Sequence, residues 1–341
     1  MGQGQVSKSN AWKVYTVLGF AFWAHYGITA KFSSIGYEHA SELTFVWVCA
    51  VYTVIGTGLS IMLMKIQKDD AAFPYWSWHW SAVAGLVGAG GAVCVIQAMK
   101  IGNPVFVMPL VFGPAQGFNA LFTRVLQGFK HRPNVWFWVG LTGLIGCSVM
   151  VQGMKSDTGI EELEGGTWLI WTLMAAACWG MYGVASRMAV MHSAKASSGH
   201  GSHLRVLLGV SLVYAVFGLG TWVFGLAGLS NPITGEALFG SGSGVAFGLL
   251  TGLAGLGGAA FVIPANSVPG SPGPIVVMAV VFMGAAGVNA LATFLWEWVY
   301  LDVSPTVTIP FIVSLIGLAV SGGVFSLNSP NRPPKQVGRP A

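Results

Sequence analysis

The sequence predicts an all-α, polytopic membrane protein in which ten transmembrane helices form a 5+5 inverted repeat. Three observations predict this fold: long apolar segments, an alternation of basic residues between the segments that join them, and a match between the two halves. Of the 341 residues, 54% are hydrophobic and only 8% are charged, whereas soluble domains carry about 25% charged residues. This composition excludes a soluble domain, and its apolar richness excludes a disordered chain.

Ten segments are apolar over the roughly 20 residues that a helix needs to cross the hydrocarbon core. The predicted spans are 12–32, 43–64, 79–99, 104–126, 134–154, 167–189, 205–229, 243–264, 273–299 and 304–326. They divide the chain into a first repeat (1–154), an extracytoplasmic linker (155–166), a second repeat (167–326) and a disordered cytoplasmic tail (327–341). No joining segment is long enough to fold as a separate domain.

The basic residues predict the orientation of these spans. With ten spans, the N-terminus, every second loop and the C-terminal tail together hold 13 of the 16 Lys and Arg residues. Because Lys and Arg concentrate on the cytoplasmic side, we expect a protein of the cytoplasmic (inner) membrane with both termini in the cytoplasm. The excess of positive charge therefore reflects topology and does not indicate nucleic-acid binding.

The two halves of the chain match each other at four places. Trp23-Ala24-His25-Tyr26-Gly27 corresponds to Trp179-Gly180-Met181-Tyr182-Gly183, and the glycine series 85–92 corresponds to 252–259. Span 4 corresponds to span 9 and span 5 to span 10, whereas spans 2 and 7 show no convincing match. Since five spans per half is an odd number, the second half must cross in the opposite sense, which is an architecture common among secondary transporters.

Several of these motifs resemble the drug/metabolite transporter superfamily in its ten-helix EamA-like branch. They are the Trp-x-x-Tyr-Gly stretches of spans 1 and 6, the turn 98–102 (Ala-Met-Lys-Ile-Gly) and the Leu-Ile-Gly segments of spans 5 and 10. The resemblance covers nearly the whole chain. It implies a basket of helices around a central cavity that moves a small polar metabolite or drug by alternating access. The turn 269–274 in the second half (Pro-Gly-Ser-Pro-Gly-Pro) departs from the family's pattern.

Polar and aromatic residues in the middle of spans are the candidate substrate-binding groups, because an unpartnered polar group is costly in hydrocarbon. The candidates are Trp23, Tyr26, Gln97, Gln116, Asn119, Trp179, Tyr182, Asn266 and Asn289. The amides suit a neutral or zwitterionic solute; the alternative is that they hydrogen-bond between helices as structural links. The aromatic pairs suit walls or gates around a solute, and the alternative for them is packing or an interfacial belt.

Interruptions of the backbone hydrogen bonding within spans are a further pointer to a transporter site. Pro104, Pro109 and Pro114 in span 4, with Pro272 and Pro274 at span 9, predict such interruptions at corresponding places in the two halves. The glycine series of spans 3 and 8 has neither the strand nor the acidic residue of a dinucleotide site. It is instead typical of helices that pack closely.

His25 is a candidate for proton coupling, since histidine titrates near neutral pH; a structural, hydrogen-bonded histidine is the alternative. The four Cys residues lack the spacing of a metal site, and we expect neither a metal nor another cofactor. We expect a non-enzymatic carrier whose partners are a small-molecule substrate and the bilayer. A coupling proton or other ion and a homodimer remain open, and a membrane-embedded enzyme or a flippase for lipid-linked substrates is the alternative function.

Overall fold

A computed structural model describes most of the chain. The described residues are 10–38, 40–69, 73–102, 104–129, 131–152, 167–196, 202–224, 233–268, 270–301 and 309–330. Among them the regular structure is helical throughout, without a strand. The predicted linker 155–166 lies outside the described residues, as do residues 331–341 of the predicted tail.

The described residues form a succession of helices. In chain order they are α2 (Ala11–Gly36), α3 (Ser41–Val51), η1 (Tyr52–Gly56), α4 (Thr57–Ile66), α5 (Tyr75–Ile101), α6 (Pro104–Gln127), α7 (Val135–Gln152), α8 (Thr167–Ala196), α9 (Ser202–Phe224), α10 (Gly235–Phe239), α11 (Gly242–Ala265), α12 (Pro274–Leu301) and α13 (Ile309–Leu327). The π-helical turn η1 joins α3 to α4 without a break, so these three elements form one long helix.

Seven helices within the described residues are long and apolar enough to cross a membrane. They are Glu42–Ile66, Tyr75–Lys100, Thr167–Ser193, His203–Trp222, Gly242–Ala265, Pro274–Trp296 and Ile309–Leu327. The predicted spans 12–32 and 104–126 are helical as α2 and α6 but are not among the seven, and α7 contributes the shorter apolar helix Val135–Cys147. These apolar helices fit a multi-pass membrane protein.

The prolines of span 4 interrupt the backbone hydrogen bonding without ending the helix. Helix α6 runs through both Pro109 and Pro114 without ending, and α12 begins at Pro274, where the missing N–H and the fixed φ of proline suit the first position of a helix. Neighbouring helices in a bundle can satisfy the carbonyl groups that a proline leaves unbonded, which explains how α6 continues.

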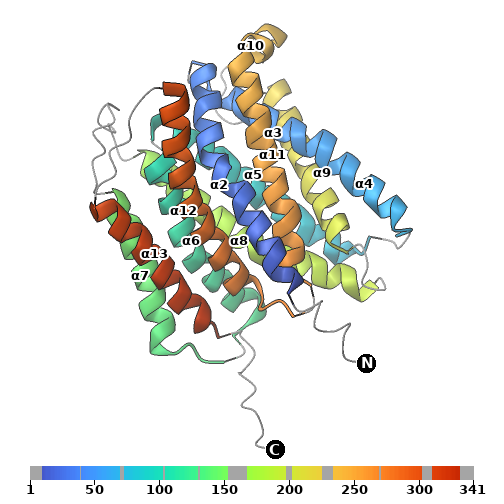
Figure 1. Cartoon of the computed structure of the whole chain (residues 1–341). Coiled ribbons are helices and arrows are strands. Elements are labelled where there is room, and N and C mark those ends of the chain that lie inside the picture. Colours follow the sequence, from blue (N-terminus) through green and yellow to red (C-terminus); the bar gives the residue numbers. More distant parts are fainter. Residues whose placement is uncertain are drawn as a thin grey trace, which may run out of the picture.

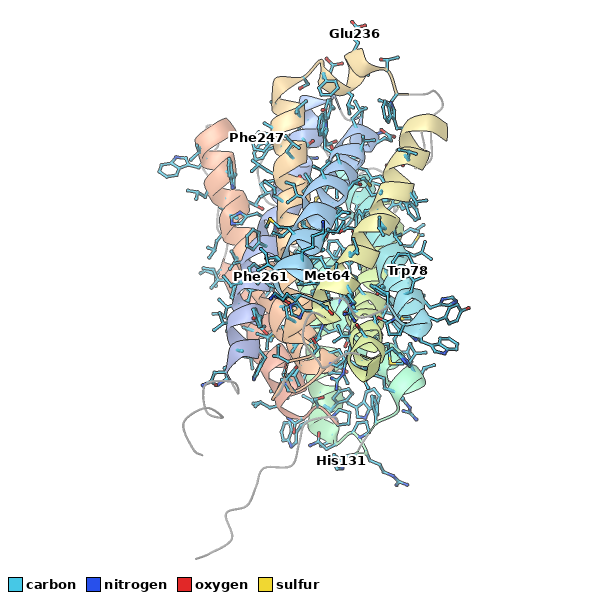
Figure 2. The ribbon with its side chains drawn as sticks, turned by 90° about the vertical axis from the view of Figure 1, so that its right-hand side faces the viewer. Met64, Trp78, His131, Glu236, Phe247 and Phe261 are labelled. Atoms are coloured by element: carbon cyan, nitrogen blue, oxygen red, sulfur yellow. The ribbon has the colours of Figure 1, made fainter. Side chains whose placement is uncertain are left out.

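Helices of the first half of the sequence pack against helices of the second half (Figure 1). Helix α2 packs against α11 and α12, α8 packs against α5 and α6, and α7 lies beside α13. Helix α2 begins and α13 ends at the lower end of the molecule. In Figure 2, His131 between α6 and α7 lies at that end, and Glu236 of α10 lies at the opposite end.

Glycines allow close approaches between these helices, including at positions outside the predicted glycine series. A Cβ added to Gly36 of α2 would lie 2.6 Å from the backbone nitrogen of Gly244 in α11, and one added to Gly140 of α7 would lie 2.5 Å from that of Phe325 in α13. Real Cβ atoms do not approach so closely, so only glycine lets these backbones meet.

A buried ion pair joins the chain after α4 to the first turn of α9. Arg205 donates to Asp69, and their side chains are only 2% and 6% exposed. Among the residues that the structure describes, one nitrogen of this guanidinium and one oxygen of this carboxylate have no hydrogen-bond partner. Removing one member of such a pair leaves an uncompensated buried charge, which is far more costly than replacing both members with apolar groups.

We therefore expect Asp69→Asn to destabilise the protein by about 3–5 kcal/mol, because Arg205 is left unpaired. The double variant Asp69→Leu/Arg205→Met should regain most of that loss. Thermal unfolding of the purified protein in detergent measures both effects. Lys65→Gln, at an exposed position of α4, is the control and should melt like the unmodified protein, and so would Asp69→Asn if the pair contributed nothing.

Candidate functional site

Four aromatic rings from four helices form one layer in the middle of the molecule. Trp23 of α2 and Trp179 of α8 lie 6.0 Å apart between ring centroids, with their planes only 12° apart. Phe112 of α6 and Phe282 of α12 lie 5.2 Å apart at 18°. Each phenylalanine also stacks on one indole, at 5.8 and 5.9 Å. The layer therefore joins helices from both halves of the sequence.

Each indole is held by the glycine-rich helix opposite to it. Trp23 Nε1 donates to the Gly255 carbonyl of α11 at 3.2 Å, and Trp179 Nε1 donates to the Gly88 carbonyl of α5 at 3.4 Å. A Cβ added to Gly258 would overlap the Trp23 ring, and one added to Gly91 would overlap the Trp179 ring. The two indoles occupy the space that glycine leaves free.

Four tyrosines lie beside the indoles. The Tyr26 ring meets Trp179 edge-on at 5.6 Å and the Tyr182 ring meets Trp23 at 6.0 Å. The rings of Tyr52 and Tyr214 stack face to face at 3.9 Å and 5°. Tyr52 stands at the start of the π-helical turn η1, a feature that is frequent at functional sites.

These side chains enclose a small cavity. Its lining is formed by Trp23, Tyr26, Tyr52, Gly88, Ala92, Trp179, Tyr182, Tyr214 and Gly255. Inside, room remains for about one or two water molecules, so a metabolite can enter only if the rings move apart. None of the nine lining residues carries a formal charge at neutral pH.

Two hydroxyl groups at the cavity are free to bind something else. Tyr26 and Tyr182 are 2% and 3% exposed, and neither hydroxyl has a hydrogen-bond partner among the described residues. Buried hydroxyls are normally hydrogen-bonded, so these groups call for an explanation such as a water or a ligand. The cavity thus offers six aromatic rings and two unpaired hydroxyl groups.

The structure brings together the predicted aromatic residues but not the predicted amides. Asn119 donates to the Gly180 carbonyl of α8 at 2.9 Å, and Asn289 donates to the Ala24 carbonyl of α2 at 2.8 Å. Both amides are buried outside the cavity lining. Their nitrogens therefore link helices, as the structural alternative for these residues proposed, while their oxygens have no partner within the described part of the chain.

The other predicted amides also lie outside this cavity. Gln116 is buried, and its Oε1 has no hydrogen-bond partner among the residues described. Asn266 lies just after α11, with its Nδ2 4.0 Å from the Met278 sulfur. Gln97 is half-buried in α5 and interacts with another residue.

The proton-coupling candidate His25 lies on the opposite face of α2. Its side chain is exposed, whereas those of Ala24 and Tyr26 on either side are buried. Because neighbouring positions on a helix are about 100° apart, Trp23 and Tyr26 can share the inner face and leave His25 outside. The structure does not bring His25 to the cavity.

Sequence reasoning missed Tyr52 and Tyr214. They belong to spans 2 and 7, for which the two halves show no convincing match. A signal is nevertheless present, because both follow a valine and they are 162 positions apart. This offset lies between the 156 of the Trp-Tyr motifs and the 167 of the glycine series, so Tyr52 and Tyr214 occupy corresponding places.

Comparisons with known proteins support the fold alone. No protein-family model matches the chain, and no curated protein matches it. One similar solved structure, described only as "Crystal structure of protein", superposes with a TM-score of 0.55 at 16% sequence identity. The match covers 94% of this chain and 99% of that one. The helical arrangement is therefore found in another protein of nearly the same extent.

The contact between Trp179 and Gly91 can be tested beside a matched control on the same helix. Gly91→Ala places a methyl group in the space of the Trp179 ring, whereas a Cβ added to Gly90 meets only the Cys178 sulfur at an ordinary 3.7 Å. We expect Gly91→Ala to cost about 1–3 kcal/mol through overpacking and Gly90→Ala to have little effect. Thermal unfolding in detergent measures both, and equal melting temperatures would contradict the described packing.

Proposed function

We propose that the protein is a secondary transporter that binds a small organic solute at the aromatic cavity and carries it by alternating access. The observation that supports this most directly is that both halves of the sequence contribute to the cavity lining. Each tyrosine or tryptophan of the lining that comes from the first half has a counterpart from the second half. Trp23, Tyr26 and Tyr52 correspond to Trp179, Tyr182 and Tyr214. Substrate sites between repeats are typical of secondary transporters.

We further propose that the ten predicted spans form a 5+5 inverted repeat, as in the EamA-like branch that the motifs resemble. The contacts come in matching pairs: Trp23 bonds to Gly255 as Trp179 bonds to Gly88, and Asn289 bonds to Ala24 as Asn119 bonds to Gly180. Such reciprocal contacts are what a twofold relation between two halves produces. With five spans in each half, that twofold axis lies in the membrane plane.

The hydrogen bonds that cross the closed cavity suggest which contacts break during transport. Each indole donates to a helix of the opposite half, over 3.2 and 3.4 Å, which is at or beyond the long end of ordinary N–H···O bonds. Rocking of the halves would break these weak bonds and separate the stacked rings on one side of the membrane at a time. The solute then takes the place of the contacts between rings.

The membrane-embedded enzyme and the lipid-linked flippase are less well supported. Catalysis needs a nucleophile with a base, a pair of carboxylates or a similar set of groups, and the lining consists of aromatic residues, glycine and alanine. We therefore propose a carrier of the cytoplasmic membrane, with a small-molecule substrate, both termini inside the cell and a coupling ion or homodimer as further partners to be tested.

Transport by the purified protein in liposomes tests the proposal. Vesicles are incubated with a defined metabolite mixture, and their contents are analysed by mass spectrometry to find the solute that accumulates. We expect Trp23→Leu and Trp179→Leu to lower its uptake at least about tenfold, since aromatic side chains supply most of the contact area of such a site. Trp298→Leu, at a position that is 59% exposed, is the matched control, and equal uptake by all three would exclude this cavity.

The inverted repeat predicts a specific topology. Single cysteines replacing Lys68 and Arg132 should react with a membrane-impermeant thiol reagent only from the cytoplasmic side, because positive charge stays inside. A cysteine replacing Glu161 should react only from the outside. Labelling of intact cells and of inverted vesicles measures both, and the opposite pattern at any of the three positions would overturn the proposed orientation.

A further inference from the structure

We infer that Lys31 and Arg187 are latches, that is, positioning residues whose contacts hold one end of the cavity shut until they break. Lys31 closes the outer end and Arg187 closes the cytoplasmic end. The inference rests on the proposed transport function and its orientation, and it adds the residues that control which end opens. It comes from the places of the two cations in the fold and from the segments that they contact.

The two cations occupy corresponding positions in the sequence. Lys31 follows Tyr26 by five residues, and Arg187 follows Tyr182 by five residues. Each cation therefore lies about one and a half turns beyond a tyrosine of the cavity, on α2 and on α8 respectively. Both side chains are half-buried. Charged residues within membrane-spanning helices are rare, and they commonly mark a transport pathway.

Lys31 connects α2 to the turn between α5 and α6. Its Nζ donates to the Met99 carbonyl at 2.9 Å and to the Gly102 carbonyl at 3.2 Å. These carbonyls lie at the C-terminal end of α5, where a cation is favoured. Helix α2 begins at the lower end of the molecule (Figure 1), so this contact near its last turns lies towards the upper end. In the proposed orientation, that end faces the outside.

Arg187 contacts the matching turn between α11 and α12. A Cβ added to Gly273 would overlap Nη1 of Arg187, so the guanidinium packs directly against this glycine. Helix α11 runs opposite to α2, because Gly36 near the end of α2 meets Gly244 near the start of α11. The turn that follows α11 therefore lies at the lower end, which faces the cytoplasm in the proposed orientation.

The usual distribution of basic residues does not explain the position of Lys31. It is one of only three Lys and Arg residues, out of 16, that fall on the outer side in the predicted topology. Basic residues are favoured on the cytoplasmic side, so topology alone disfavours a lysine here. A specific role at this end of the molecule accounts for it.

Buried oxygens without partners lie between the cavity and the latches. Asn119 and Thr123 of α6, with Asn289 and Thr293 of α12, are at most 1% exposed. Their side-chain oxygens have no hydrogen-bond partner in the part of the chain that the structure describes. Buried polar atoms of this kind call for a water or a ligand. An end that opens would bring water and solute to them.

The oxygens of α6 lead towards Arg187. Gly180 of α8 meets Phe118 and Gly183 meets Asn119, so α6 and α8 run in the same direction. Thr123 is four residues beyond Asn119, and Arg187 is four residues beyond Gly183. One turn farther along both helices, the unpartnered Thr123 hydroxyl is thus at the level of the cation.

The oxygens of α12 lead towards Lys31 in the same way. The Asn289 Nδ2 lies 3.1 Å from a Cβ added to Gly27 of α2. Thr293 is four residues beyond Asn289, and Lys31 is four residues beyond Gly27. Each latch therefore stands at the outer limit of a buried polar stripe, at opposite ends of the molecule.

Opening of an end must break the latch at that end. Lys31 and the turn that it contacts belong to the first half, and Arg187 and Gly273 belong to the second half. The movement that breaks a latch therefore takes place within a half and adds to the rocking between the halves. Removal of one latch leaves the other in place, so the population shifts towards the state that is open at the unlatched end.

The experiment measures from which side the cavity can be reached. In a background without the four native cysteines, Ala92→Cys places a thiol in the cavity lining. A membrane-impermeant thiol reagent is applied to intact cells and to inverted vesicles. We expect Lys31→Met to raise the reaction rate from the outside at least about fivefold and to lower the rate from the cytoplasmic side. Arg187→Met should have the reverse effect.

Two exposed cations on neighbouring helices are the matched controls. Lys100→Met in α5 and Arg124→Met in α6 remove the same charge at exposed positions and should leave both rates unchanged. Lys31→Arg and Arg187→Lys keep the charge and should restore both rates to within about twofold. A Met variant that fails to fold, as shown by thermal unfolding, is replaced by Lys31→Gln or Arg187→Gln, which should shift the rates in the same directions.

The outcomes separate this inference from the proposed function. A thiol that reacts from both sides, with a ratio of rates that neither variant changes, would support alternating access and overturn the latches. Equal increases from both sides, or shifts towards the same side in both variants, would also overturn them, because a merely structural role loosens both ends. A thiol that reacts from one side only in every variant would contradict alternating access itself.

Discussion

The structure depends on the packing of Trp23 and Trp179 against the glycine-rich helices α11 and α5. The Trp23 ring lies over Gly258 and the Trp179 ring lies over Gly91, where the glycines have no side chain. The N–H of each ring donates to the carbonyl of a glycine one turn away on the same helix, Gly255 and Gly88 respectively. This contact sets how closely α2 approaches α11 and how closely α8 approaches α5. Once the indoles are fixed, Phe112 and Phe282 complete the layer and the four tyrosines stand around it. A Cβ on either glycine is incompatible with this arrangement.

The contacts that join the two halves at the cavity are also the contacts that the proposed transport cycle would have to change. Each of the four reciprocal hydrogen bonds, from Trp23, Trp179, Asn119 and Asn289, crosses between the halves. The indole bonds are long, and the two amide oxygens have no partner in the described ranges of the chain. At the cavity itself, paired aromatic contacts and polar groups without a full set of partners can be exchanged for other contacts at moderate cost, whereas the close packing of α2 on α11 and of α7 on α13 is more rigid. A solute that fits between the rings can supply the missing contacts.

Much of this arrangement could be predicted from the sequence. Composition and long apolar segments predict the helical, membrane-type fold, and the motifs around Trp23 and Trp179 identify two aromatic pairs that do meet at the centre. The glycine series was correctly taken as a packing surface. Each of these features is local, because a few adjacent positions determine which face of a helix can be buried and how near another helix can come.

Other features depended on contacts between distant segments. Tyr52 and Tyr214 were missed because the sequences around them diverge, although their rings stack in three dimensions. A buried amide has the same sequence signature whether it binds a solute or links two helices, and only the position of Gly180 and Ala24 shows that Asn119 and Asn289 link helices. Similarly, His25 lies inside a predicted span, but one step around the helix turns it away from Tyr26.

The central claim is that the halves separate at this cavity during transport. It can be tested in a cysteine-free background with the double variant Tyr52→Cys/Tyr214→Cys, whose native rings stack at 3.9 Å. A short bifunctional thiol reagent that is cleaved by reductant joins the two positions. We expect cross-linking to abolish the reduced uptake that the double variant retains without the two rings, and cleavage of the link to restore that reduced uptake. Undiminished uptake by fully cross-linked protein would contradict the account.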